Sequence, residues 1–210
     1  MLFQMVVAKA LKNVDITEEV SHFNPVLERD GGVYVSTIDS PILVQTPSLT
    51  LETDLGENDS FANVRLKSTD VVFFKEVEEA LLKLALANKA TWFREDIADE
   101  TIVQSLRSFL QEDERSLRVR VSDGVVAFDA EKTRVTLPIA AGTRVKAVLE
   151  LARITFSKTQ FGAVWNLKQI RLVEDTRYLF DEEATSGLVE DINESILLAE
   201  HDEELVPHLE

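Results

Sequence analysis

The sequence predicts a mainly β protein with helical insertions, an α+β fold whose sheet bends into a small barrel. Two long apolar runs, at 144–156 and 162–172, are rich in β-branched and aromatic residues and flank the polar segment 157–161. We expect the two runs to form a hairpin, because Gly162 can supply the positive φ that turns and bulges often need. Both runs exceed the usual strand length, which favours coiling or bulges. Apolar side chains change face within 150–153, as in a strand that bends into a barrel.

The N-terminal part is expected to be a meander of short strands. Residues 1–8 predict a strand, whereas 9–30 is polar and is expected to be irregular up to a turn at 30–32. Further strands are predicted at 33–38, 42–46, 48–53 and 61–67, with a turn at 39–41 and a loop at 55–60. In the last of these, Val64 and Leu66 share one face while Arg65 and Lys67 share the other.

The hydrophobic period changes after Asp70. Apolar residues then recur at helical spacing, which predicts a helix over 72–88. A second helix is predicted over 97–110, with Asp96 as its N-cap. Trp92 lies between the two helices and is expected to close the core.

Strand character returns beyond residue 114. Leu117, Val119 and Val121 alternate with Arg118 and Arg120, so this stretch predicts a strand with two arginines on its solvated face. A hairpin turn is expected at 122–124, a strand at 125–128, a turn at 129–133 and a strand at 134–137. We therefore expect a single barrel domain over 1–180, with the helical insertion at about 70–110.

The composition limits the class of protein. The chain has 210 residues, 45% of them hydrophobic, which is enough for one sizeable core. It has no cysteine, which excludes disulfides and thiolate metal sites and favours an intracellular location. No run reaches the roughly 18 apolar residues of a membrane span, so no membrane partner is expected.

Charge is distributed unevenly along the chain. The formal net charge is −16, yet residues 115–177 carry 12 Lys plus Arg against 6 Asp plus Glu, a local balance of +6. Residues 181–210 carry 11 acids and no Lys or Arg. We expect an acidic C-terminal tail, partly helical or disordered, beside a basic centre.

The motifs of common enzymes are absent from the sequence. It contains no glycine-rich phosphate loop, no serine elbow and no His-Glu-x-x-His pair. We therefore predict a protein that is not an enzyme, with no catalytic residues, no metal site and no cofactor. A nuclease that uses paired carboxylates stays open as an alternative.

Basic and aromatic residues interleave on the predicted strands of the basic centre. Proteins that hold single strands without sequence preference combine a cationic groove for phosphates with rings on which bases stack. Phe161, at the expected hairpin tip, and Trp165 are the candidate rings. The candidate cations are Arg118, Arg120, Arg144, Lys146, Arg153, Lys158, Lys168 and Arg171. The alternative interpretation is that Trp165 is a core residue and the cations form ordinary solvated faces.

The acidic tail also has a physical interpretation. A tethered polyanion competes for a cationic groove at a high effective concentration, and single-stranded DNA would release it to recruit replication proteins. The alternative is a solubilising extension.

The stretch 145–173 resembles a known family. Its centre, Phe-Gly-Ala-Val-Trp-Asn-Leu-Lys-Gln-Ile at 161–170, is similar to the closing hairpin of OB-fold single-stranded-DNA-binding proteins of nucleocytoplasmic large DNA viruses. Ser-Pro-Ile-Leu-Val-Gln-Thr-Pro at 40–47 is similar to an early segment of such proteins. The tail resembles those of phage and bacterial single-stranded-DNA-binding proteins, but it lacks their terminal aromatic residue.

The resemblance implies a specific fold and role. The fold would be a five-stranded OB-like barrel with helical insertions. The protein would bind single-stranded DNA sequence-independently in viral DNA replication, recombination or repair, in the host cytoplasm or nucleus. The rival is a viral structural or assembly protein whose β surface and tail contact other proteins. Whether the chain forms a homo-oligomer is left open.

Overall fold

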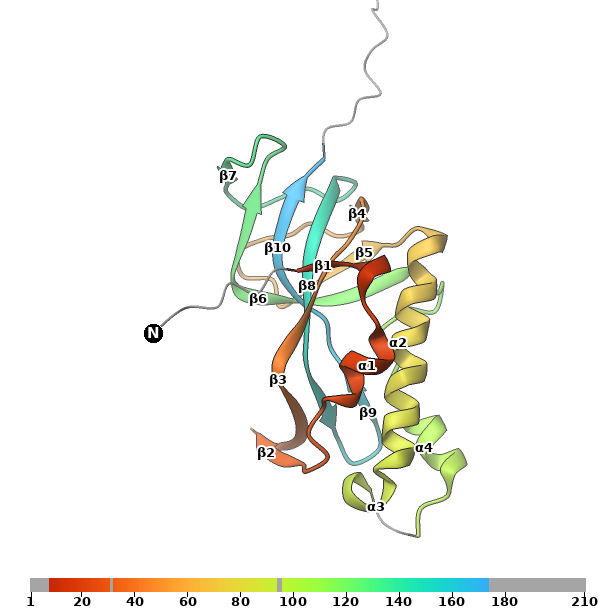
Figure 1. Ribbon diagram of the computed structural model, residues 1–210. Helices are drawn as coiled ribbons and strands as arrows, with labels where there is room; N and C mark the ends of the chain where they lie inside the picture. Colours follow the sequence, from red (N-terminus) through yellow and green to blue (C-terminus); the bar gives the residue numbers. More distant parts are fainter. Residues whose placement is uncertain (1–7, 31, 94–95, 174–210) are drawn as a thin grey trace, which may run out of the picture. The chain divides into compact units, whose positions relative to one another are not determined.

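The computed structural model describes residues 8–30, 32–93 and 96–173, and the expectations for 1–7 and for the tail at 181–210 lie outside the described residues. One sheet and several helices make up this part (Figure 1). The strands are β1 (Lys9–Ala10), β2 (Glu28–Asp30), β3 (Val33–Gln45), β4 (Leu49–Leu51), β5 (Phe61–Arg65), β6 (Ser116–Phe128), β7 (Arg134–Val135), β8 (Arg144–Phe156), β9 (Phe161–Ala163) and β10 (Asn166–Leu172). The helices are η1 (Leu11–Asn13), α1 (Ile16–Ser21), α2 (Ser68–Ala87), α3 (Lys89–Trp92) and α4 (Asp99–Ser105).

Five of the strands close into a barrel. Around the barrel the strands follow in the order β4, β5, β6, β10 and β8, and β8 pairs with β4 to close the ring. Every pair in the ring is antiparallel except β6 with β10, which is parallel. Counted along the chain, barrel strands one to five are therefore arranged 1-2-3-5-4. This order, with its parallel pair between the third and fifth strands, is that of an OB-like Greek-key barrel and confirms the predicted fold class.

The long hairpin that the sequence predicts is present, and its first arm bends as expected. β8 covers 144–156, and its alternation of buried residues breaks at Ala152 and Arg153, both of which are half-buried. Opposite this point the β3–β8 register shifts between Thr37 and Ile42. β3 pairs with β8 on both sides of the shift, whereas β8 pairs with β4 and β10 at its barrel end and with β9 at the other end.

Two predicted turns are wrong, because the chain stays in the sheet at both places. β3 runs without interruption through the expected turn at 39–41. β6 likewise continues through 122–124, and its register with β10 shifts between Val121 and Val126. β6 has more residues than β10 at this shift. Gly124 lies among them with φ 75°, a conformation that residues with a side chain rarely adopt.

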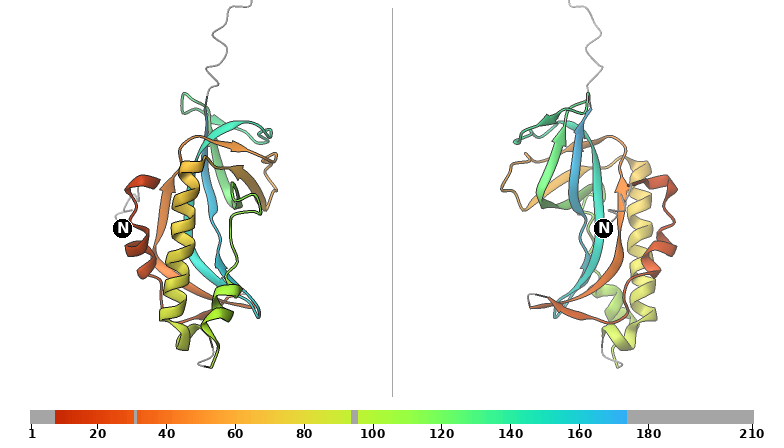
Figure 2. Two further views of the ribbon diagram at one scale, coloured as in Figure 1. Left: turned by 90° about the vertical axis from the view of Figure 1, so that its right-hand side faces the viewer. Right: turned by 60° about the vertical axis from the view of Figure 1, so that its left-hand side comes forward.

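The predicted long helix is confirmed, whereas the second is shorter than predicted. α2 begins four residues before the predicted 72–88 helix and ends at Ala87, and it lies along the strands with α1 against it (Figure 2). α4 ends at Ser105, because Arg107 N–H donates to Phe161 O at 2.8 Å and the chain continues extended beside β9. α1 lies in a stretch expected to be irregular, where the Asp15 carboxylate accepts a hydrogen bond from Glu18 N–H at 3.1 Å.

Trp92 has the predicted core role. Its ring is buried, and its Nε1–H donates to Pro25 O at 2.7 Å. Among the helices within 8–30, 32–93 and 96–173, none combines the length and apolar composition needed to cross a membrane.

Candidate nucleic-acid interface

Trp165 is a core residue, so the prediction that it stacks on bases is wrong. Its side chain is 0% exposed, and its ring centroid lies 5.5 Å from that of Phe74 on α2, edge to face. Phe73 and Phe109 also pack on it. Its Nε1–H has no hydrogen-bond partner among the described residues. Trp165 therefore holds α2 against the barrel and presents no face to a ligand.

Phe161 is also buried, which corrects its predicted place at an exposed hairpin tip. The turn occupies 157–160, and Phe161 begins β9, directly opposite Phe156. The two rings stack with centroids 5.8 Å apart and planes 12° apart, and Phe93 packs against Phe161 at 5.3 Å. Since Phe161 is only 2% exposed, it is part of the core.

The predicted cations do not form one groove along the hairpin. Arg153 pairs with Asp30 at 2.6 Å, and Lys168 lies 3.6 Å from Glu150. Arg144 donates from Nε to Ser48 Oγ at 3.3 Å. Several basic residues of the hairpin are thus held by nearby carboxylate or hydroxyl groups.

Two of the predicted cations meet an exposed aromatic ring on the outer face of β5 and β6. The guanidinium carbon of Arg118 lies 4.2 Å from the centroid of the Phe61 ring, within cation–π distance. Arg120 is directly opposite Phe61, and Asn63 is directly opposite Arg118. Phe61 remains 43% exposed, so much of its surface is free for another planar group.

The sequence alternation explains why these side chains face outward. On β5, Ala62 and Val64 point into the core, and on β6 Leu117, Val119 and Val121 do the same. Residues between them must project to the other side of the sheet.

Phe61 was missed at the sequence level, although a signal for it exists. Phe61 is four residues before Arg65, so in a strand the two side chains lie on the same face, opposite the inward-facing Val64 and Leu66. Extending that alternation back to Phe61 places its ring on the basic face. The sequence alone could not pair this ring with Arg118, because that contact depends on the register of β5 with β6.

A pocket of about 260 Å³ adjoins the Phe61 ring. Its polar lining includes Arg107, Ser108, Gln111, Arg118, Ser157 and Gln160, and its apolar lining includes Phe109, Phe156, Phe161 and Ala163. Predicted Lys158 is exposed in the 157–160 turn, whose Ser157 and Gln160 line this pocket. Polar groups and aromatic rings thus surround a space beside the exposed ring.

Arg65, on the same outward face of β5, does have carboxylate partners. Arg65 pairs with Glu52 at 2.5 Å and with Asp113 at 3.4 Å. Backbone N–H groups of Arg115 and Ser116 donate to Asp113 and lower the pKa of its carboxyl, which keeps it ionised. In the part of the chain that the structure describes, no carboxylate forms an ion pair with Arg118 or Arg120. Arg118 and Arg120, beside Phe61 on β6, are therefore among the cations without an ion-pair partner in the described residues.

No metal centre is found in 8–30, 32–93 or 96–173, where no group of three or more His, Asp or Glu side chains is arranged to hold an ion. The β5–β6 face presents the guanidinium groups of Arg118 and Arg120 and the exposed Phe61 ring. These groups suit a planar, anionic ligand.

Several solved structures are similar to this chain at low sequence identity. A single-stranded DNA-binding protein from bacteriophage Enc34, in complex with single-stranded DNA, is 11% identical with a TM-score of 0.45, over 74% of this chain and 98% of that one. A C-terminal truncation of the Enc34 protein is 11% identical with a TM-score of 0.47, over 77% and 98%. Bacteriophage T7 gp2.5, a single-stranded DNA binding protein, is 12% identical with a TM-score of 0.40, over 67% and 97%.

No curated protein sequence matches the chain. A family model does match, over residues 53–184, which include every strand of the barrel except β4. This match covers more than half of the sequence. The chain therefore belongs to a family of unknown function, DUF5871.

Proposed function

We propose that this protein binds single-stranded DNA, without sequence preference, on the outer face of β5 and β6. The observation that carries the proposal is the exposed Phe61 ring with Arg118 over it and Arg120 directly opposite. A base stacks on an exposed ring for about 1–3 kcal/mol, and stacking tolerates every base because each has a π-face. Arginines beside the ring would contact the adjoining phosphates.

The position of this face in the barrel supports the same function. β5 and β6 are the second and third barrel strands, and that face of an OB-fold is the usual site for oligonucleotides. Asp54 and Asp59 line a hollow on one side of Phe61 and would repel phosphates there. The strand would therefore pass over β6 and toward the pocket lined by Arg107 and Gln160.

The proposed activity is binding with no chemical step. We place it in DNA replication, recombination or repair in a virus, as the resemblance of 145–173 to proteins of large DNA viruses implies. Replication proteins that contact the acidic tail are part of the same proposal.

The test is fluorescence anisotropy of a labelled oligo-dT compared with a duplex of the same length, across a range of salt. We expect the single strand to bind more tightly than the duplex, because paired bases have no free face for Phe61. Affinity should fall as salt rises, through release of counterions from the phosphates. Equal affinity for the two forms, or binding that is insensitive to salt, contradicts the proposal.

A further inference from the structure

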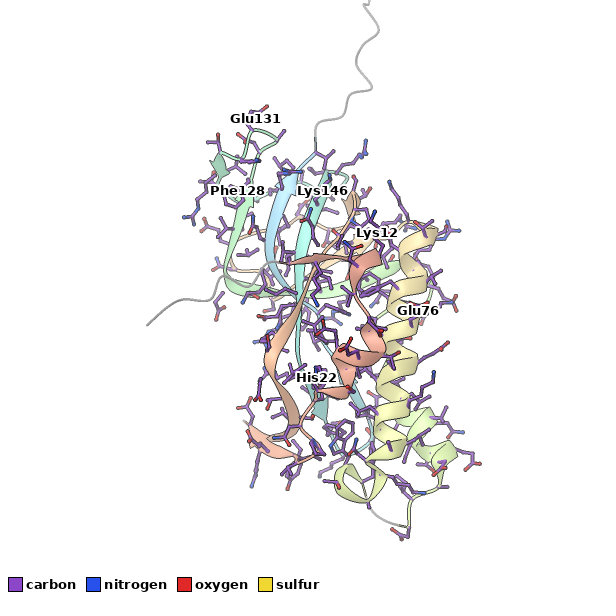
Figure 3. All side chains as sticks on the ribbon, viewed as in Figure 1. Lys12, His22, Glu76, Phe128, Glu131 and Lys146 are labelled. Carbon is purple, nitrogen blue, oxygen red and sulfur yellow. The ribbon has the colours of Figure 1, made fainter. Side chains whose placement is uncertain are left out.

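A second row of outward-facing residues crosses four strands at the end of the sheet near β7. Lys146 on β8 is directly opposite Arg171 on β10, Arg171 is opposite Phe128 on β6, and Phe128 is opposite Arg134 on β7. We call these four residues the β7-end row. Figure 3 shows Lys146 and Phe128 at this end of the sheet.

The row faces away from the barrel core. The neighbouring cross-strand row consists of Ala147, Ile170 and Ala127, all of which are buried. Successive residues of a strand point to opposite sides, so the β7-end row lies on the outer surface. Its four side chains are half-buried or exposed, Phe128 among them.

The row carries three cations, and the acids Asp129 and Glu131 lie in the turn that joins β6 to β7. Lys146 and Arg171 face each other directly across β8 and β10, an arrangement that is unfavourable for like charges. No carboxylate of the described residues forms an ion pair with Lys146, Arg171 or Arg134.

Two other outward cations of the same sheet do have such a partner. Arg153 pairs with Asp30, and Lys168 pairs with Glu150. The β7-end row is therefore a local concentration of positive charge around a half-exposed ring, which suits a polyanion that carries planar groups.

We propose that the β7-end row is a second contact for the single strand that binds at Phe61. The inference rests on the proposed function and extends it. Lys146, Arg171 and Arg134 bind successive phosphates, and Phe128 offers its ring edge or face to a base.

The two contacts are joined by β6. Arg120 precedes its irregular segment at 122–125 and Phe128 follows it, and β6 turns sharply between them (Figure 1). On β10 the matching positions are Asn166 and Arg171, five residues apart, or about 17 Å at about 3.3 Å per residue. OB-folds bind about 4–16 nucleotides, so a long oligonucleotide can reach both contacts while a short one occupies only one.

The experiment compares a labelled oligo-dT of about 4 nucleotides with one of about 16, the two ends of the usual range of site sizes. The variant carries Lys146→Gln and Arg171→Gln. The control carries Lys75→Gln and Lys83→Gln on α2, which changes net charge equally. The slope of log affinity against log salt is measured for each protein by fluorescence anisotropy.

For the long oligonucleotide we expect the slope of the variant to be shallower by about 1.4, since each lost phosphate contact removes about 0.7 for single strands. The short oligonucleotide should bind the variant and the wild type with the same slope. The α2 control should match the wild type for both lengths.

Other results overturn the inference. An unchanged slope with the long oligonucleotide, while the wild type binds both lengths, removes the second contact and leaves the Phe61 site intact. An equal loss of slope at both lengths shows that the row belongs to the primary site. If the wild type binds neither length, the proposed function and this inference fail together.

Discussion

The guanidinium carbon of Arg118 lies 4.2 Å from the centroid of the Phe61 ring, with the two residues on adjacent strands of the barrel. One face of the ring is thereby held beside a cation, and 43% of the side chain stays exposed. A nucleobase on the ring would also lie close to the positive charge that its phosphates need. This pair is the basis of the predictions about binding.

Phe61→Ala should weaken binding of oligo-dT by about 1–3 kcal/mol, the usual contribution of one stacked base. Because the ring is exposed, thermal unfolding should change little. Tyr34→Ala is the matched control, since Tyr34 is an aromatic residue on β3 that is 54% exposed. Fluorescence anisotropy measures both variants. Equal affinities for Phe61→Ala and the wild type would remove Phe61 from the site.

Arg118→Lys should lower affinity at every salt concentration while keeping the salt slope of the wild type. Lysine retains the positive charge but lacks the planar guanidinium that lies over the Phe61 ring. Arg118→Gln should in addition reduce the slope by about 0.7, the value for one lost phosphate contact with a single strand. If the lysine variant binds as tightly as the wild type, the planar contact has no role in binding.

Phe161→Ala should lower the free energy of unfolding by about 3–5 kcal/mol, because it empties a space among Phe93 and Phe156 in the core. Urea denaturation measures this. At temperatures where the variant is folded, its affinity for oligo-dT should stay close to that of the wild type. A variant with normal stability and lost binding would restore Phe161 as a contact residue.

Gly162→Ala should destabilise the protein by about 1–3 kcal/mol through overpacking. A Cβ at this position would lie 2.8 Å from the backbone oxygen of Arg107, in the segment that runs beside β9. Urea denaturation again provides the measurement. Wild-type stability of this variant would mean that the 106–108 segment can move away from β9 at no cost.

Asp113→Ala should destabilise the protein near pH 7, and the difference should shrink in acid. The pKa of Asp113 lies below its ordinary value of 3.8, mainly because backbone N–H groups of Arg115 and Ser116 donate to the carboxylate. Its contribution is thus present above the unfolded-state pKa and is lost as pH falls through the folded-state pKa. Urea denaturation at several pH values measures it, with Glu112→Ala as the control. A difference that grows in acid contradicts the assignment.

Local patterns in the sequence were sufficient to predict several elements of the fold. The bounds of β8, the change of face at 152–153, the helix α2 and the outward arginines of β6 all follow from spacing along one segment. Such features depend on alternation or helical period, which are properties of neighbouring residues. The change of face in β8 also predicted a small barrel, and the resemblance implied its five-stranded OB-like form. Its closure by β4 with β8 is seen only in three dimensions.

The site could be predicted only in part. The sequence by itself determined that Arg118 and Arg120 are solvated and that basic residues concentrate in 115–177. Tertiary structure decided that Phe161 and Trp165 are buried, that Phe61 is the exposed ring, and which cations have carboxylate partners. The physical reason is that these outcomes depend on strand register and on the packing of α2 and the 106–110 segment, which join residues far apart in the chain.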